Sequence, residues 1–378
     1  MKKIFFLIWE NPKSHQVILP LIKEISKNNK IYLISKEDKN IDNLNSRDSN
    51  LSKYCVNKKI FYSKNFKFLN KINLLYFYLI SFLLIIFKRP KYIYILNNYP
   101  ILLYFLVRIF INAKFIYHNL DYNPSPSGIF QNILKKIEIK FVKYFDLIIF
   151  SHQMRAKRFK QDAKLTQNNL VFFNSLPKDF YKGYKFKQKK NSNKKTIFYF
   201  GSIGPGHGLQ QLVISSKYYD KNINLSIFGW VVDQKYYLKI IDLIKKNNLQ
   251  SKVNIKINVQ DFVWKSEILK CHLGIALYEM NSLSHKFMFT ASQKINAYLA
   301  AGIPILVSHT DDNKNYLRKY KCGFSSRLNS KFIAKKINRI FKNKKNYDKI
   351  KKNSQKAFKN EFNFEKQYFR LNEKLNNF

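Results

Sequence analysis

The segment from Ser292 to Ser308, SQKINAYLAAGIPILVS, restricts the fold of this chain more than any other stretch. Thr290 can cap a helix here, with a glutamine three residues later at the spacing of a capping box. Gly302 suits a left-handed helix end, and Pro304 prevents the helix from continuing. The apolar run 305–307 is typical of a central parallel strand. A helix, a tight turn and a buried strand in succession predict an α/β domain, and the helix N-terminus is a potential phosphate site.

Strand and helix patterns alternate along most of the chain. Short apolar runs typical of strands occur at 3–9, 30–35, 92–96, 114–117, 147–150, 171–173, 196–200, 225–228, 253–257 and 273–277. Helical periodicity is found at 14–27, 72–87, 100–110, 129–144, 208–219, 234–247 and 264–270. This alternation predicts parallel, doubly wound sheets. The polar segment 37–59 is predicted to be irregular.

The clearest break in composition is the segment 181–195, YKGYKFKQKKNSNKK, which is basic and nearly free of aliphatic residues. We interpret it as a linker between two domains. A chain of 378 residues is long enough for two ordinary cores. The predicted domains therefore span residues 1–180 and 196–361.

The net charge of +46 comes from lysines that are spread along the whole chain. Even spacing favours a biased composition over a nucleic-acid surface, so no nucleic-acid partner is expected. A basic surface would still favour anionic lipids and a diphosphate substrate. Cys55, Cys271 and Cys322 have no zinc or redox spacing, which indicates a reducing, cytoplasmic compartment. No metal-binding pattern stands out.

The run Ile72 to Phe87 contains no charged residue. It is shorter than the roughly 20 residues of a spanning helix. A buried domain helix is favoured, and a helix in the bilayer interface, suggested by aromatic residues such as Tyr76 and Phe82, or a spanning helix remain alternatives. The N-terminal apolar run ends at Glu10 without a cleavage site, so it is predicted to be a strand and not a signal peptide.

The first segment also carries a family resemblance. It is similar to the donor-site segment of retaining GT-B glycosyltransferases of family 4, the glycosyl transferases group 1. The matching positions are Lys294, Tyr298, Leu299, Ala300, Gly302 and Pro304. The glutamate that holds the nucleotide ribose in the family falls on Ala297. The resemblance implies two Rossmann-like, doubly wound parallel-sheet domains that face a cleft. It also implies a terminal helix, 362–378, that packs back on the first domain.

A second motif, FGSIGPGHGL at 200–209, places glycines between a strand and a helix, where the backbone can approach a ligand. Gly201 and Gly208 match the family, whereas Ser202 and His207 replace its basic residues. Glu279 is a candidate substitute for the missing carboxylate or a surface residue, and Trp230 is a candidate neighbour of the nucleotide base or a core residue. The expected donor-binding residues are Gly201, Gly204, Gly206, His207, Gly208, Gly229, Glu279, Thr290, Ser292 and Lys294.

In the first domain, His118 follows a strand, at the edge where doubly wound sheets bind ligands. The resemblance implies that a histidine at this point lines the sugar pocket, so His118 is the predicted catalytic residue, with Asn119 and Asp121 as neighbours. A loop histidine without a catalytic role is the alternative. Glu138 and Asp146 are expected to serve helix packing and turn capping.

Together these features predict a glycosyltransferase of surface polysaccharide biosynthesis. It would move a sugar from a nucleotide-sugar donor to a saccharide or lipid-linked acceptor, with retention, in the cytoplasm at the inner face of a membrane. No cofactor and no metal are expected, because a helix terminus and basic side chains can stabilise the departing diphosphate. The alternatives are a catalytically degenerate GT-B binding subunit, which the departures at Ala297, Ser202 and His207 would suit, and a sugar-nucleotide epimerase.

Overall fold

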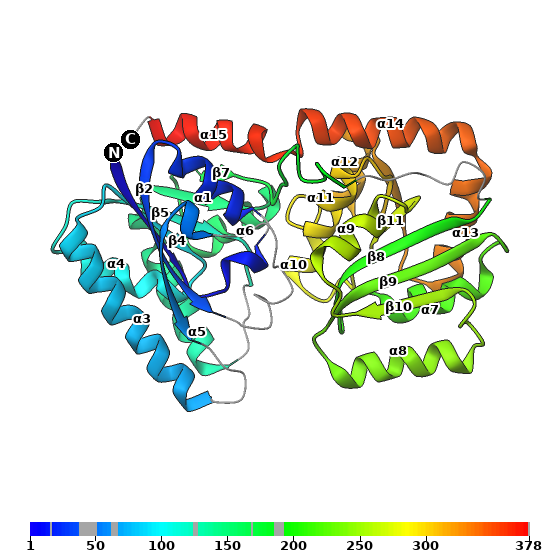
Figure 1. Cartoon of the computed structure of the whole chain (residues 1–378), viewed down its shortest axis with the longest axis horizontal. Coiled ribbons are helices and arrows are strands. Elements are labelled where there is room, and N and C mark those ends of the chain that lie inside the picture. Colours follow the sequence, from blue (N-terminus) through cyan, green and yellow to red (C-terminus); the bar gives the residue numbers. More distant parts are fainter. Residues whose placement is uncertain are drawn as a thin grey trace. The chain divides into compact units, whose positions relative to one another are not determined.

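The computed structural model describes residues 1–15, 17–37, 51–61, 67–123, 128–167, 169–184 and 193–376 (Figure 1). These residues form two compact units, of which the first comprises Met1–Asn174 with Gln367–Phe378 and the second Ser175–Lys366. The first boundary lies six residues before the predicted end at 180. Each unit holds one parallel sheet, which confirms the predicted pair of doubly wound α/β domains. The predicted linker 181–195 lies partly outside the described residues.

The sheet of the first unit has the order β3-β2-β1-β4-β5-β6-β7, with every pair parallel. The strands are β1 (Lys2–Ile8), β2 (Asn29–Glu37), β3 (Val56–Phe61), β4 (Tyr92–Leu96), β5 (Lys114–Asn119), β6 (Leu147–Phe150) and β7 (Asn169–Val171). The chain winds outward in one direction from β1 and in the other from β4. The carboxyl ends of these two strands therefore mark the switch point, where such sheets bind ligands.

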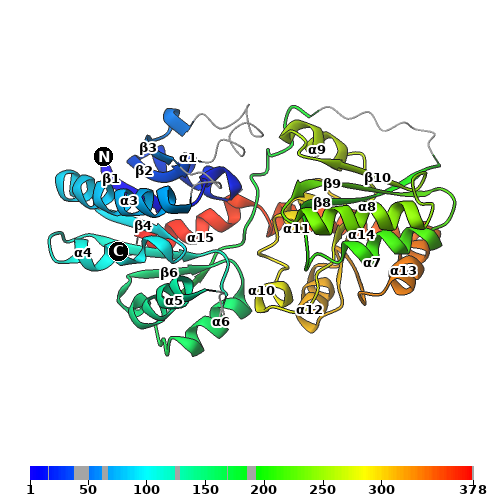
Figure 2. The same ribbon diagram turned by 90° about the horizontal axis from the view of Figure 1, so that it is seen from below.

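The helices of the first unit agree largely with the predicted periodicity. They are η1 (Pro12–Ser14), α1 (Ile18–Ser26), η2 (Leu51–Lys53), α3 (Lys67–Lys88), η3 (Tyr99–Leu102), α4 (Leu103–Arg108), α5 (Ile129–Phe141), η4 (Val142–Tyr144) and α6 (Gln153–Asp162). In α1, one side of the helix is buried, formed by Ile18, Leu21, Ile22 and Ile25. Helices α3 and α4 lie side by side (Figures 1 and 2).

Two elements of this unit differ from the prediction. The strand β3, VNKKIF, begins in the segment 37–59 that was expected to be irregular and ends two residues after it. It is an edge strand, where lysines are tolerated and a continuous apolar run is not needed. The helix α6, QMRAKRFKQD, was not predicted because its buried side contains only Arg155, Ala156 and Phe159. Residues 38–50 of the segment 37–59 lie outside the described residues.

The sheet of the second unit has the order β10-β9-β8-β11-β12-β13, again with every pair parallel. The strands are β8 (Lys195–Ile203), β9 (Ile223–Val231), β10 (Val253–Ile257), β11 (Leu273–Ala276), β12 (Ile305–Ser308) and β13 (Gly323–Ser326). The helices are α7 (Leu209–Ser215), η5 (Ser216–Tyr218), α8 (Gln234–Lys246), α9 (Asp261–Ile268), α10 (Leu283–Lys286), α11 (Gln293–Ala300), α12 (Asp311–Tyr320), α13 (Ser330–Lys342) and α14 (Lys344–Asn360). The last helix, α15 (Phe364–Asn376), begins in this unit and continues in the first. The switch point lies between β8 and β11.

Tyr298 fixes α11 against this switch point. Its hydroxyl donates to the carbonyl of Phe198 at 3.0 Å and accepts the N–H of Phe200 at 3.1 Å, so the helix is tied to β8. Its ring lies on Gly274 of β11, where a Cβ atom would be only 2.2 Å from the ring. A glycine is therefore required in the strand for the helix to pack so closely.

Candidate functional site

The glycine-rich loop and the donor helix meet at the switch point of the second unit. Strand β8 ends at Ile203, and α7 begins after Gly208, whose φ of +61° is the left-handed conformation that glycine adopts readily. The N–H of Glu279, just after β11, donates to the carbonyl of Gly206 at 2.9 Å. The loop after β11 is therefore joined to the glycine loop, and both lie beside the start of α11.

Lys294, in the first turn of α11, is the central residue of this site. It is only 8% exposed. Its Nζ atom lies 5.2 Å from the ring centre of Tyr199 and 5.3 Å from that of Tyr278. A Cβ atom on Gly201, which has a φ of +135°, would be 2.7 Å from this Nζ. The structure therefore brings together Lys294 and Gly201, which the sequence predicted as parts of two separate motifs.

The charge of Lys294 has no counter-ion among the described residues. Burial alone lowers the pKa of its amino group to about 8, and no carboxylate offsets this effect. The two tyrosine rings stabilise the cation only modestly, by about 0.5–2 kcal/mol each. A buried lysine without an acidic partner, at a sheet switch point, indicates a site for an anionic ligand.

The N-terminus of α11 begins beside the lysine, at Ser292. The Ser292 hydroxyl accepts the N–H of Ile295 at 3.4 Å and exchanges a hydrogen bond of 2.8 Å with the Tyr278 hydroxyl. The predicted cap, Thr290, was wrong. The Thr290 side chain is instead hydrogen-bonded to Tyr316, and so the helix starts two residues later than the capping-box spacing suggested.

His207 and His285 complete the polar surroundings of the site. The His207 ring lies 5.6 Å from that of Tyr278 and 5.8 Å from that of His285. Burial, with smaller contributions from Lys294 and His285, lowers the pKa of His207 to about 2. His207 is therefore neutral near pH 7. It can contribute a hydrogen bond to a ligand, as expected, but it does not replace the positive charge of the family's basic residue.

The glycines of the site are needed for packing against the protein itself. The contacts that an added Cβ would make are 2.3 Å at Gly204 with Val232, 2.4 Å at Gly206 with His285, 2.6 Å at Gly208 with Leu328 and 1.9 Å at Gly229 with the Gly201 carbonyl. The sequence predicted these glycines for the close approach of a ligand. The structure adds a further reason, since a Cβ atom added at any of these positions would meet another residue.

Three further positions that the sequence analysis discussed, Ala297, Glu279 and Trp230, differ in how exposed they are. Ala297 is fully buried, and its carbonyl accepts the Tyr181 hydroxyl at 3.1 Å, so this position faces the core. Glu279 is half-buried in the loop after β11. Trp230 is 40% exposed, with its ring 5.7 Å from Phe200. The rings of Tyr199 and Tyr278 around Lys294 were not predicted, although Tyr278 follows a strand end as ligand-site residues do.

In the first unit, the structure places His118 in the core. The side chain is 0% exposed, and its Nδ1 atom is hydrogen-bonded to the Tyr94 hydroxyl. Burial lowers the pKa of His118 to about 3, which keeps the ring neutral. The other ring nitrogen, Nε2, is buried without a hydrogen-bond partner among the described residues, and the catalytic role of His118 stays a prediction. Asn119 is also buried, whereas Asp121 is 73% exposed.

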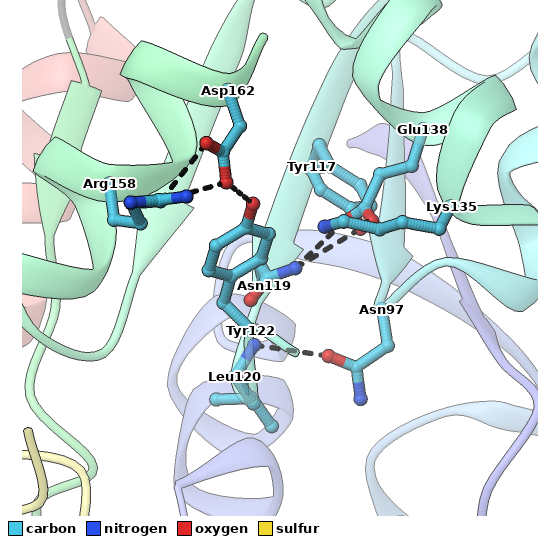
Figure 3. A network of polar contacts seen from close by, with 9 residues as sticks. All are labelled: Asn97, Tyr117, Asn119, Leu120, Tyr122, Lys135, Glu138, Arg158 and Asp162. Carbon is cyan, nitrogen blue, oxygen red and sulfur yellow. Dashed lines mark hydrogen bonds and ion pairs between the residues drawn. The ribbon is translucent and has the colours of Figure 1, made fainter. Parts of the chain in front are cut away.

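The sequence predicted helix packing and turn capping for Glu138 and Asp146, and the structure places both carboxylates in polar contacts within the first unit. Glu138 is buried in a polar network, where it accepts Asn119 at 2.8 Å and the Tyr117 hydroxyl and pairs with Lys135 at 2.9 Å (Figure 3). Asp146 accepts the N–H of Phe115 at 2.8 Å. Both carboxylates are engaged by their own unit. No group of three or more metal-binding side chains occurs among the described residues.

A comparison with protein families finds a match in the second half of the chain. Residues 181–357 match the model of the family described as glycosyl transferases group 1. The matched region contains the glycine loop, β11 and the donor helix. No curated protein sequence matches the chain.

Solved structures with the same fold cover nearly the whole chain. The crystal structure of Anabaena Alr3699/HepE in complex with UDP and glucose has a TM-score of 0.78 at 15% identity and covers 100% of both chains. A glycosyltransferase from Rickettsia africae ESF-5 has a TM-score of 0.76 at 14% identity, over 98% of this chain and 97% of that one. WaaG, a glycosyltransferase involved in lipopolysaccharide biosynthesis, has a TM-score of 0.67 at 10% identity, over 97% and 98%. These likenesses show the GT-B fold.

Proposed function

We propose, from the match of residues 181–357 to the family model of the glycosyl transferases group 1, that this protein moves a sugar from a nucleotide sugar to a saccharide or lipid-linked saccharide. The observation that carries the proposal is the buried, unpaired amino group of Lys294 at the start of α11. A nucleotide diphosphate is an anion of the kind that this group would bind. UDP is the first nucleotide to test, because a similar structure, that of HepE, is a complex with UDP and glucose.

The chemistry required of the site is stabilisation of a leaving diphosphate. As the bond between the sugar and the phosphate oxygen breaks, negative charge grows on that oxygen. The Lys294 ammonium and the N-terminal dipole of α11 would both stabilise this charge. The neutral His207 ring can add a hydrogen bond. We propose that transfer proceeds with retention through an oxocarbenium-like transition state, as the family resemblance implies, and needs no metal.

The second candidate is a degenerate subunit that binds a nucleotide sugar without transferring the sugar. Ala297 favours this alternative, because it is buried and provides no carboxylate for the ribose. The two candidates agree on nucleotide binding and differ on turnover. An epimerase would convert the nucleotide sugar without releasing free diphosphate.

Release of UDP from UDP-sugars separates these candidates. The wild-type protein is expected to release UDP, slowly to water and faster with an acceptor, and Lys294→Met should reduce the rate by about 100-fold. Lys335→Met, at an exposed position on α13 of the same unit, is the control with the same change of charge. Nucleotide binding without UDP release would indicate the degenerate subunit. A folded protein that binds no nucleotide would refute both.

We further propose that the acceptor is reached at a membrane surface, through α3 and α4 of the first unit. The apolar residues of α3 that are exposed recur at helical spacing: Leu69, Ile72, Leu75, Tyr76, Leu79, Leu83 and Phe87. The opposite side, with Phe77, Ser81 and Ile85, is buried. The end of α4 continues the apolar surface with Leu106, Ile109 and Phe110, and the Phe110 ring contacts Phe82 at 5.7 Å.

The charges around this apolar surface favour an anionic bilayer. No aspartate or glutamate occurs between residues 67 and 110. The exposed basic residues Lys71, Lys88, Arg89, Lys91 and Arg108 lie near the ends of the two helices. By length and composition, Leu69–Lys88 is the one candidate membrane span among the described residues. Because one side of α3 packs in the core, we favour a helix that lies in the interface.

A further inference from the structure

A connected polar cluster occupies the switch point of the first unit, beside the strand end that carries His118. Glu10 lies two residues after β1, and Asn97 directly follows β4. These are the two strands between which the direction of winding reverses. His15 lies just after η1, in the same connection as Glu10. Polar side chains at this edge of a doubly wound sheet are placed where ligands bind.

Asn97 connects three strand ends and orients the carboxylate. Its Oδ1 atom accepts the N–H of Leu120 at 3.0 Å, and its Nδ2 atom donates to Oε1 of Glu10 at 2.7 Å. Its backbone has a φ of +56°, a left-handed conformation that asparagine tolerates better than most residues, and its N–H donates to the His118 carbonyl. Glu10 is therefore held by one oxygen, which leaves its other oxygen, Oε2, for His15.

His15 uses one ring nitrogen within the cluster and leaves the other available. Its Nε2 atom is hydrogen-bonded to Oε2 of Glu10. No bond from its Nδ1 atom to another described residue occurs. The side chains of His15 and Glu10 are 17% and 34% exposed, so the cluster is partly accessible to a ligand. This arrangement, an oriented imidazole with one free nitrogen, presents a directed hydrogen-bonding group.

We propose that Glu10, His15 and Asn97 form a binding site for a hydroxyl group of the saccharide acceptor, which hydrogen-bonds to Nδ1 of His15. The proposal deepens the proposed function, on which it rests. A saccharide hydroxyl fits because it accepts such a hydrogen bond and, being neutral, tolerates the nearby Glu10 carboxylate. Glu10 and Asn97 are positioning residues, and His15 is the residue that touches the ligand.

The charges around His15 favour its protonated form. Burial opposes protonation, but the carboxylate of Glu10 and its hydrogen bond outweigh burial and raise the pKa of His15, with a smaller contribution from Asp121. Asp121 is itself paired with Arg155 at 3.1 Å. Two further groups face the cluster: Lys36 on β2, which acts on Glu10, and His118, which burial keeps neutral. A protonated ring gives a charge-assisted hydrogen bond, which is about twice as strong as a neutral one.

The proposal predicts how the affinity for the acceptor depends on pH. Acceptor binding should be tightest while His15 is protonated and should weaken as the pH rises through its raised pKa. Glu10→Gln removes the charge that raises this pKa. In that variant, the weakening should begin at a lower pH. A purely structural role for the cluster would not move the pH profile of acceptor binding in this direction.

The experiment uses the full chain and a printed array of oligosaccharides at several pH values. The wild type is expected to bind a subset of glycans, and His15→Phe should bind them about 10- to 100-fold more weakly, the loss expected for a hydrogen bond to a charged group. Glu24→Gln, on α1 of the same unit, is the control, since its carboxylate pairs with the neighbouring, exposed Lys27 and not with the cluster. Melting temperatures show that each variant is folded.

Several results would overturn the proposal. They are a wild type that binds no glycan, a His15→Phe variant that binds as the wild type does, and an unchanged pH profile in Glu10→Gln. UDP binding is measured in parallel and should be the same in all these variants, because the donor residues lie in the other unit. A wild-type protein that does not bind UDP would refute the proposed function instead. Failure of the acceptor site and failure of the proposed function are therefore distinguishable.

Discussion

The Nζ atom of Lys294 lies 2.7 Å from the position that a Cβ atom on Gly201 would occupy. One residue belongs to the first turn of α11 and the other to β8, 93 positions earlier in the sequence. Their contact joins the two motifs of the candidate donor site. It also explains why the lysine can be so deeply buried, since only a residue without a side chain leaves room for the amino group.

Gly201→Ala should therefore damage the site more than a single methyl group suggests. The new Cβ would collide with the Lys294 amino group, and alanine is strained at a φ of +135°. We expect the free energy of unfolding to fall by about 1–3 kcal/mol, together with loss of UDP binding. Chemical denaturation and UDP titration measure the two effects. Gly183→Ala is the control, because Gly183 also has a positive φ, of +87°, but an added Cβ there meets no atom within 4 Å. Equal UDP affinity in both variants would contradict this account.

Lys294→Met should stabilise the protein while it strongly weakens nucleotide binding. Below pH 8 the folded protein holds a buried ammonium group without a counter-ion, which favours the unfolded state. The pKa of Lys294 is lowered from 10.5 to about 8, so the unfolded state binds more protons between these values and the stability of the wild type should rise with pH there. The wild-type free energy of unfolding should increase by about 3 kcal/mol in total across this pH range. Chemical denaturation of the wild type and of Lys294→Met at pH 7 and pH 10 measures these stabilities. A Lys294→Met variant that is less stable than the wild type at pH 7 would contradict the prediction, because it would show that the charged amino group stabilises the folded state.

The apolar surface of α3 and α4 should bind vesicles of anionic lipid. Co-sedimentation with phosphatidylglycerol vesicles is expected to exceed that with phosphatidylcholine, because each basic residue near the surface adds about 1 kcal/mol. Leu75→Glu with Leu79→Glu should abolish binding, while Leu238→Glu, on α8 of the other unit and equally exposed as Leu79, should not. The protein could instead fail to bind vesicles and form dimers in a concentration-dependent way. If Leu75→Glu with Leu79→Glu removed these dimers, the surface would be assigned to contact with a second copy of the chain.

The fold was largely predictable because its central strands are buried on both faces and read as apolar runs. The strand β3 and the helix α6 escaped prediction for the opposite reason, since an edge strand with lysines and a helix with a narrow buried side carry little periodicity. Lys294 was found from its motif. Its tyrosine neighbours were not, because Tyr199 and Tyr278 approach it only through the fold.

The same limit applies to the first unit. His118 was chosen because it follows a strand, but position along the chain does not say which side of the sheet a residue faces or how deeply it is buried. Glu10, His15 and Asn97 are separated by up to 87 residues and meet only at the switch point. The N-cap of α11 was wrongly predicted at Thr290 for a similar reason, since the Thr290 side chain is hydrogen-bonded to Tyr316, which is distant in the sequence.

The central claim is that Lys294 holds a nucleotide diphosphate, and thermal unfolding with UDP tests it most directly. At one hundred times the dissociation constant, UDP should stabilise the wild-type protein by about 2.7 kcal/mol. Lys294→Met should lose this shift, and Lys335→Met should keep it. An equal shift in the wild type and in Lys294→Met, or no shift with any nucleotide in a protein that is demonstrably folded, would contradict the account.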